Sequence, residues 1–359
     1  MDSESIKIAV DLDGGDHAPK VVTKGIFLAI KKGWALPQQI VVLGSSESIS
    51  KFRQKDTFGI TCQECSQTIA MGDDLNQIRK KRRSSIALGV YGVKTENFNA
   101  FVSAGETKAM VIWGKMLLAP KTEGLDLRPA IGVKMPHLNG LWLLVDAGAN
   151  LEARSVINLV HNAQMGAIYA QEVMGIENPK IGLINIGQES SKGDQILKDA
   201  HTLLAQSPLN FIGNVEARDL FFGKVDVAVC EGWDGNLILK TGEGIIEMLK
   251  IIGKKEFKRL FSKPTFPSFT RRLLAYISMP AVWLLIVMAM PLLYITYQEI
   301  KRKISYEEVG GAALLGTPGM VICHGRSNAK AIANAIKFAA QESQSQVHNL
   351  ITTTLTKTQ

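Results

Sequence analysis

Short apolar runs alternate with longer stretches of helical periodicity along most of this chain. The apolar runs have the length of buried strands and lie at residues 6–10, 40–43, 100–102, 141–145, 181–184, 211–212, 225–230 and 320–323. The helical stretches between them lie at residues 21–31, 84–94, 107–118, 153–174 and 329–340. Continuous apolar strands separated by helices are typical of a mostly parallel sheet covered by helices on both faces. We therefore predict an α/β fold of this kind.

Loops of small and polar residues follow six of the predicted strands. They lie at residues 11–17, 103–107, 146–150, 185–193, 231–236 and 325–327. One glycine loop before a helix is usually a turn, but six of them at strand ends are hard to assign to turn chemistry alone. In parallel sheets the ligand crevice lies beyond the carboxyl ends of the strands. We therefore expect the six loops to meet at one crevice.

The most informative of these segments runs from Phe211 to Asn236. A buried strand at residues 225–230 is followed by a loop with two glycines, two carboxylates and an amide, and a helical pattern opens at Leu237. Glycine loses the most entropy on ordering, so we expect a loop of this composition to bind a ligand.

Glycines, hydroxyl groups and helix N-termini can bind an anion such as phosphate without a nucleophile. Ser103, Thr107 and Ser191 are placed as helix caps or phosphate donors, and for any single one of them plain helix capping is the favoured interpretation. Lys192 and Lys240 can supply positive charge or be solvated surface lysines. His17 and His324 both follow strands. A lone histidine is more often structural, but two histidines at one crevice strengthen the case for acid–base work. The dinucleotide fingerprint and the Walker A, HExxH and GxSxG motifs are absent from the sequence.

Composition sets the class of protein and of partner. The 359 residues are 46% hydrophobic and 21% charged, which is ordinary for an enzyme with a buried core. Four cysteines are too few for a disulfide scaffold and indicate a reducing compartment; we read Cys62 and Cys65 as incidental thiols, not a zinc site. The formal charge of +8 suits an anionic partner, namely nucleic acid, a lipid surface or an acidic protein. The polar, acidic N-terminus does not resemble a signal peptide.

Two segments outside the loops suggest contacts with partners. The basic run Arg79-Lys-Lys-Arg-Arg83 precedes a predicted helix, where positive charge opposes the helix dipole, so we do not expect it to serve helix stability. It can be a solvated loop, a nucleic-acid patch or a docking site for an acidic carrier protein.

Residues 273–298 carry no charge and are interrupted by Pro280 and Pro291. As one helix they would be roughly 39 Å long, enough to cross a bilayer, but both flanks are basic. We favour a helical hairpin whose apolar tip enters one leaflet, over a buried dimerisation hairpin and over a membrane span.

Several blocks of sequence together resemble the PlsX family, the phosphate acyltransferases of bacterial phospholipid synthesis. The resemblance covers residues 6–340, and its most specific blocks are Gly14-Gly-Asp-His-Ala-Pro19, Val102-Ser-Ala-Gly105, Ile181-Gly-Leu-Ile-Asn-Ile-Gly187, Phe211-Ile-Gly-Asn-Val-Glu-Ala-Arg-Asp219, Val225-Asp-Val-Ala-Val-Cys230 and Gly310-Gly-Ala-Ala-Leu-Leu-Gly316.

The resemblance implies that inorganic phosphate attacks the thioester of a long-chain acyl-acyl carrier protein, giving acyl phosphate. It also implies a fold similar to isocitrate and isopropylmalate dehydrogenases and to phosphate acetyltransferases, no cofactor or metal, and a homodimer. We further expect a cytoplasmic enzyme associated with the inner face of the membrane, where a membrane acyltransferase of the PlsY type consumes the product. The domains then comprise an α/β domain at residues 1–342 with two lobes around a crevice, an inserted hairpin at 245–305, and a flexible tail at 343–359.

The loops supply candidates for each role in this reaction. We expect phosphate to be bound by residues of the strand-end loops: Asp11, Gly14, Gly15, Ser103, Gly105, Thr107, Asn185, Gly187 and Ser327. Asn185, Asn214 or Asn236 is expected to donate to the thioester oxyanion, and Lys192 or Lys240 to neutralise phosphate charge. Asp16, His17 or His324 is expected to tune protonation of the phosphate or of the leaving thiol.

Some loop residues depart from the family pattern. They are Asp13, Glu106, Lys108, Trp233, Asp234 and Arg326, where the family has Met, Asn, Gly, Phe, Val and Ser. The added carboxylates are unfavourable beside phosphate unless Lys108 or Arg326 pairs with them. A coenzyme A-dependent phosphate acyltransferase and a membrane-associated scaffold with a weakened site therefore stay open as alternatives.

Overall fold

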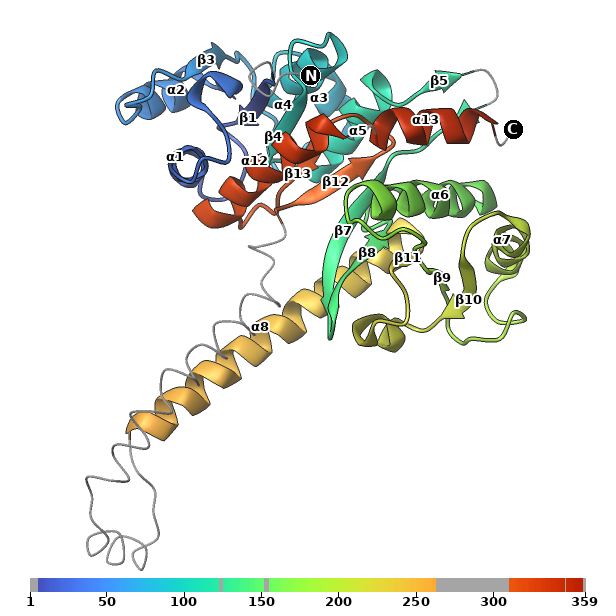
Figure 1. Ribbon diagram of the computed structural model, residues 1–359. Helices are drawn as coiled ribbons and strands as arrows, with labels where there is room; N and C mark the ends of the chain where they lie inside the picture. Colours follow the sequence, from blue (N-terminus) through green and yellow to red (C-terminus); the bar gives the residue numbers. More distant parts are fainter. Residues whose placement is uncertain (1–5, 123–124, 152–154, 263–309, 346, 358–359) are drawn as a thin grey trace, which may run out of the picture. The chain divides into compact units, whose positions relative to one another are not determined.

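Eleven strands form one mixed sheet in the computed structural model, which describes residues 6–122, 125–151, 155–262, 310–345 and 347–357. The strand order is β10-β9-β11-β8-β7-β12-β13-β4-β1-β2-β3 (Figure 1). The strands are β1 (Ile8–Asp11), β2 (Ile40–Gly44), β3 (Thr61–Glu64), β4 (Ala100–Ser103), β7 (Ala130–His137), β8 (Gly140–Val145), β9 (Ile181–Ile184), β10 (Phe211–Val215), β11 (Val227–Val229), β12 (Ala312–Leu315) and β13 (Met320–Ile322). A separate pair joins β5 (Lys121–Thr122) to β6 (Leu125–Asp126).

Helices connect these strands. They are α1 (Lys20–Lys31), α2 (Ser46–Arg53), α3 (Leu75–Lys80), α4 (Ser85–Lys94), α5 (Thr107–Leu117), α6 (Val156–Glu172), α7 (Gln195–Gln206), α8 (Gly232–Ser262), α12 (Ala329–Gln344) and α13 (Val347–Lys357), with the short 3₁₀ helices η2 (Pro37–Gln39) and η3 (Ala217–Phe222). The described residues up to Leu237 and from Gly310 onward belong to one compact unit, and those from Ile238 to Ser262 belong to a second.

The sheet consists of two parallel halves that run in opposite directions. Strands β10, β9, β11 and β8 are parallel to one another, and so are β13, β4, β1, β2 and β3. Three antiparallel pairings, β8 with β7, β7 with β12 and β12 with β13, join the two halves. The mostly parallel sheet is confirmed. An odd number of reversals leaves the two halves opposed, so their strands end at opposite edges of the sheet.

Helices cover both faces of the half that contains β1. On one face α1 packs against α12, and their buried residues share a core cluster with Ile8 and Val10. On the other face α4 and α5 pack together, and the ring of Phe101 fills the space beside Gly89. Successive residues of a strand point to opposite faces of the sheet. Because helices cover both faces here, every residue of β1 is buried.

The C-terminal segment corrects the expectation of a flexible tail at residues 343–359. Helix α12 extends to Gln344, and α13 lies alongside α6 (Figure 1). Val347, Ile351 and Leu355 are buried at four-residue spacing, so one face of α13 belongs to the core. The Ser- and Thr-rich composition hid this apolar stripe.

The start of α8 corrects the predicted glycine loop before Leu237. The helix begins at Gly232, so Trp233 to Asn236 lie in its first turns. A Cβ on Gly232 would lie 2.5 Å from the carbonyl oxygen of Asn150, and one on Gly235 would lie 1.8 Å from that of Asp146. These glycines allow α8 to pack closely against the loop after β8, which explains them without a ligand.

The apolar segment at residues 273–298 lies outside the described residues, as does the part of the predicted hairpin beyond Ser262. Within the described ranges we find no helix with the length and apolar character needed to span a membrane.

Candidate active site

The loops after β1 and β4 meet at a buried carboxylate. Ser103 Oγ donates a hydrogen bond of 2.6 Å to Asp11 Oδ2, and the backbone N–H of Gly105 donates one of 3.0 Å to Ser103 Oγ. Ser85, at the start of α4, also bonds to Asp11. Burial raises the pKa of Asp11, and these hydrogen bonds oppose that rise. The single hydroxyl proton of Ser103 goes to Asp11, so we infer that Ser103 positions the loop and does not donate to phosphate itself.

Glycines bring a third loop to the same place. A Cβ on Gly14 would lie 2.6 Å from both Asp11 Oδ2 and the backbone nitrogen of Gly105. Gly15 has φ of 101° and lies against the Gly325 carbonyl oxygen, which accepts a 2.9 Å hydrogen bond from the Asp16 N–H. The loops after β1, β4 and β13 therefore contact one another; we call them the first loop group.

Three helices begin at the first loop group. These are α1, α5 and α12, and Thr107 is the first residue of α5. Helix N-termini carry partial positive charge and free N–H groups, so their convergence favours an anion. His17, Asp16 and His324 are exposed here, whereas Ser327 is buried just before the Asn328 cap of α12.

Asp13 and Glu106, the two acidic residues of these loops that differ from the family pattern, accept hydrogen bonds from backbone N–H groups. Asp13 Oδ2 accepts 2.6 Å from the Ser45 N–H, and Asp13 Oδ1 accepts from the Ser45 hydroxyl. Glu106 caps α5, accepting from the N–H of Lys108 and from that of Gly72. The expectation that the Lys108 or Arg326 side chain must pair with them overlooked these backbone donors.

A second loop group follows β8, β9, β10 and β11. Asp146 is fully buried, and its two carboxylate oxygens accept from the N–H groups of Ile131, Gly148, Ala149 and Asn150 and from the Asn150 side chain. This carboxylate therefore builds the loop at residues 146–150. The sequence placed Asp146 in a candidate loop but gave it no role, because its partners are mostly backbone groups, which leave no sequence signal.

Two of the three candidate amides hold the loop at residues 185–193 in place. Asn185 Nδ2 donates 3.0 Å to the Lys192 carbonyl oxygen, and Asn214 Nδ2 donates 2.8 Å to that of Glu189. The exposed Lys192 side chain passes close to Gly187, where a Cβ would lie 3.1 Å from Lys192 Cγ. These contacts place Asn185, Gly187, Lys192 and Asn214 in one loop system, apart from the first loop group in strand direction.

The remaining candidates lie on α8. Asn236 is exposed and borders Gly148, in the second loop group. Lys240 belongs to the second compact unit, where its Nζ pairs with Glu243 at 3.0 Å. The structure thus places Asn236 among the loops and pairs Lys240 with a carboxylate on its own helix.

No cysteine of the described loops has the character of a nucleophile. Cys230, between β11 and α8, is buried, and its Sγ donates to the Asp146 carbonyl oxygen. Burial raises the pKa of this thiol well above its ordinary value, so it stays protonated.

Comparison with known proteins decides the family. The model of a family described as fatty acid synthesis protein matches residues 6–265 and 277–350. A phosphate acyltransferase of Heliobacterium modesticaldum is 40% identical over 342 residues, covering 94% of this chain and 93% of that protein. One of Thermoanaerobacterium thermosaccharolyticum is 39% identical, covering 93% and 92%. The chain belongs to the phosphate acyltransferase, or PlsX, family. It is therefore an acyltransferase, as the sequence blocks predicted.

Solved structures agree with this phosphate acyltransferase at the level of fold. A phosphotransacetylase of Streptococcus pyogenes aligns over 94% of both chains with a TM-score of 0.54 and 17% identity. A branched-chain phosphotransacylase of Enterococcus faecalis aligns over 94% of this chain and 99% of its own, with a TM-score of 0.54 and 13% identity. The predicted likeness to phosphate acetyltransferases is confirmed, while the likeness to isocitrate and isopropylmalate dehydrogenases stays a prediction.

Proposed function

We propose that this phosphate acyltransferase moves a long-chain acyl group from acyl carrier protein to inorganic phosphate by direct attack on the thioester. The observation that carries the proposal is the first loop group, where three loops contact one another and three helices begin. An oxyanion with two charges suits such a cluster of helix N-termini, and Gly14, Gly15 and Gly105 let it approach the backbone closely.

The second loop group is proposed to bind the thioester. The side-chain amides of Asn185 and Asn214 already donate hydrogen bonds to carbonyl oxygens of the loop. We therefore assign the oxyanion contact to the exposed Asn236. The ammonium group of Lys192, exposed on the same loop system, is proposed to neutralise charge on phosphate as it attacks.

Sheet twist supports a single crevice built from both groups. Seven steps in the strand order separate β1 from β9. A twist of about 20–25° per step adds up to roughly 140–175°. A rotation of that size would nearly cancel the opposite strand directions and bring the carboxyl ends of the two halves toward the same side, which supports the proposed crevice.

The proposed reaction needs no covalent enzyme intermediate. A phosphate oxygen forms a bond to the carbonyl carbon of the thioester, and the carbon–sulfur bond then breaks. The thiolate of the carrier protein leaves and takes up a proton, for which Asp16, His17 and His324 in the first loop group are the candidates. Positioning and oxyanion stabilisation supply the rate, because a thioester is already reactive.

The hydrogen bonds of Asp13 and Glu106 weigh against a decayed scaffold. Both carboxylates accept hydrogen bonds from backbone N–H groups, which offset part of the negative charge that would oppose phosphate. Homodimer formation, association with the inner face of the membrane and transfer of acyl phosphate to a PlsY-type membrane acyltransferase remain parts of the proposal that the family resemblance supports.

The test is to incubate the protein with phosphate and either palmitoyl-carrier protein or palmitoyl-CoA, and to follow acyl phosphate. We expect product from the carrier-protein ester, and a large loss of that activity in Asn236→Ala and Lys192→Ala. Product from the CoA ester alone would favour the coenzyme A-dependent alternative, and product from neither would favour the scaffold.

A further inference from the structure

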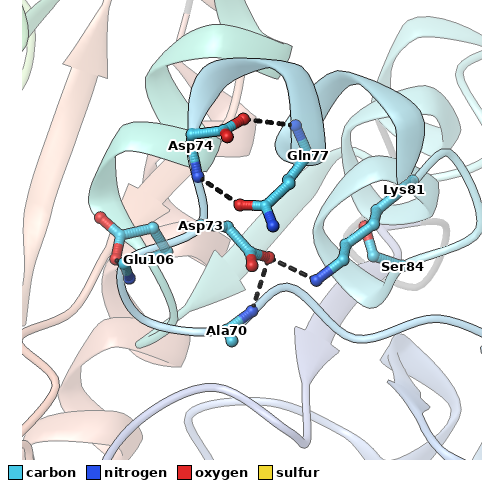
Figure 2. Close-up of polar contacts among 8 residues, drawn as sticks. Ala70, Asp73, Asp74, Gln77, Lys81, Ser84 and Glu106 are labelled. Carbon is cyan, nitrogen blue, oxygen red and sulfur yellow. Dashed lines mark hydrogen bonds and ion pairs between the residues drawn. The ribbon is translucent and has the colours of Figure 1, made fainter.

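The basic run at residues 79–83 is divided by the fold into one inward lysine and four outward cations. Lys81 Nζ pairs with Asp73 Oδ2 at 2.5 Å, and Asp73 also accepts from the N–H of Ala70 (Figure 2). Arg79, Lys80, Arg82 and Arg83 are exposed. Within the described part of the chain, none of these four forms an ion pair with a carboxylate. We call these four residues the basic patch.

The backbone beneath the basic patch is held on both sides. Asp74 caps α3 and exchanges hydrogen bonds with Gln77, as Figure 2 shows. After the run, Ser84 caps α4 and donates 2.8 Å to the Lys81 carbonyl oxygen, while the Arg83 N–H donates to Gln67. The charges therefore sit on a fixed backbone, which lowers the entropy lost when a partner binds.

Helix stability explains only part of the basic patch. Arg79 and Lys80 lie in the last turn of α3, where positive charge suits the helix dipole. The basic run thus follows the end of α3 as well as preceding α4. Arg82 and Arg83 lie between α3 and α4 and have no such role, so their charges are available to a partner.

The basic patch borders the candidate phosphate site. Arg83 is two residues from Ser85, a span of at most about 7 Å. Ser85 bonds to Asp11, and the next residue, Ile86, lies against Gly105. A partner held by these arginines would thus sit beside the first loop group.

We propose that the basic patch is the docking surface for the acidic carrier protein that brings the acyl group, an inference that rests on the proposed function. Charge complementarity with an acidic protein guides encounter and orientation. The position favours this occupant over a lipid surface, because the donor has to reach the phosphate that the neighbouring loops hold.

The test compares the double variant Arg82→Ala/Arg83→Ala with the control Lys55→Ala/Lys94→Ala, which removes equal charge from two other exposed positions. We measure kcat/KM with palmitoyl-carrier protein and with palmitoyl-CoA at fixed phosphate. In the arginine variant the ratio of the two values should fall roughly tenfold, through KM for the carrier ester. The control and Arg82→Lys/Arg83→Lys should keep the wild-type ratio.

A binding titration separates failure of docking from failure of the proposed function. Carrier protein without an acyl group is titrated into wild type and into Arg82→Ala/Arg83→Ala. Weaker binding in the variant supports docking even if the wild type makes no acyl phosphate, which would end the proposed function alone. An unchanged donor ratio together with unchanged binding overturns the docking proposal. So does a loss of binding to phosphatidylglycerol vesicles without any loss for carrier protein, because the basic patch would then serve lipid headgroups.

Discussion

Gly14 is the residue at which the candidate phosphate site has the least room. Because an added Cβ would lie 2.6 Å from Asp11 Oδ2 and from the Gly105 nitrogen, Gly14→Ala must push the loops after β1 and β4 apart. We expect a cost of about 1–3 kcal/mol in the free energy of unfolding and a rise in KM for phosphate. Urea unfolding and initial rates at varied phosphate concentration would measure both.

Gly244 supplies the matched control for Gly14. It lies within α8, and a Cβ there would meet no atom within 4 Å. Gly244→Ala should therefore stabilise the helix by up to about 1 kcal/mol. If Gly14→Ala proved as harmless as this control, the close approach of the two loops would be wrong.

Glu342, on α12, predicts how stability changes with pH. Its Oε2 atom is buried without a hydrogen-bond partner among the described residues, and burial raises the pKa of Glu342 to about 8, opposed by the charge of Lys134. In the unfolded chain the pKa has its ordinary value of 4.5, so between pH 4.5 and 8 the folded state holds more protons. Stability should therefore fall as pH rises across this window.

The substitution Glu342→Gln should reduce this pH-dependent loss in the free energy of unfolding by on the order of 2 kcal/mol, because glutamine does not ionise. Urea unfolding between pH 5 and 8 measures the effect. The range stops there because burial also lowers the pKa of Lys134 to about 8, which adds the opposite slope above it. Glu172→Gln, at an exposed position, should leave the profile unchanged, and an equal slope in wild type and Glu342→Gln would count against the buried carboxyl.

Residue types were predictable from the sequence more readily than residue partners. The glycines and hydroxyls after β1 and β4 indicated a close approach of backbone, and Gly14 and Gly105 do lie together. The bonds from Ser45 to Asp13 and from Ser85 to Asp11 join positions far apart in the chain, so no local pattern carries them. The charge of Asp13 therefore suggested repulsion of phosphate, whereas in the fold a backbone N–H group donates a hydrogen bond to this carboxylate.

At the scale of elements, the packing of helix α13 can be tested by substitutions on its buried and exposed faces. Ile351 is 1% exposed and lies at the centre of the buried stripe. Ile351→Ala should cost about 2–4 kcal/mol in the free energy of unfolding, because it leaves a cavity in the core. The exposed Thr353→Ala on the same helix should cost less than about 0.5 kcal/mol. Equal costs in the two variants would mean that α13 does not dock.

The element predictions missed strands whose sequences lack the usual strand pattern. Strand β7 contains Lys134 and Pro136, and β12 is the short run Ala312–Leu315, so neither has the continuous branched pattern that marked β1 or β9. Both are antiparallel and lie at the centre of the sheet, where neighbouring strands bury them. At β7 and β12, pairing with neighbouring strands thus determines the structure more than the local sequence pattern does. These two strands also set the relative direction of the two halves of the sheet.

At the scale of the whole molecule, the proposed function requires both loop groups to serve one reaction. Ser103 bonds to Asp11 in the first group, whereas Asn214 bonds to the loop at residues 185–193 in the second, so the two side chains share no partner. Sheet twist is the physical reason to expect a shared crevice, and a double-mutant cycle can test it without assuming which residue does chemistry.

The cycle uses Ser103→Ala, Asn214→Ala and the double variant. Their costs in the free energy of unfolding should add to within about 0.5 kcal/mol, because the sites have separate partners. Their effects on kcat/KM should not add: each loosens a loop that holds one reactant, and the second loss matters less once the first has disrupted the transition state. We expect a coupling of at least about 1 kcal/mol in kcat/KM. Simple additivity in both quantities would mean that the two loop groups serve separate sites, and the proposed crevice would then have to be abandoned.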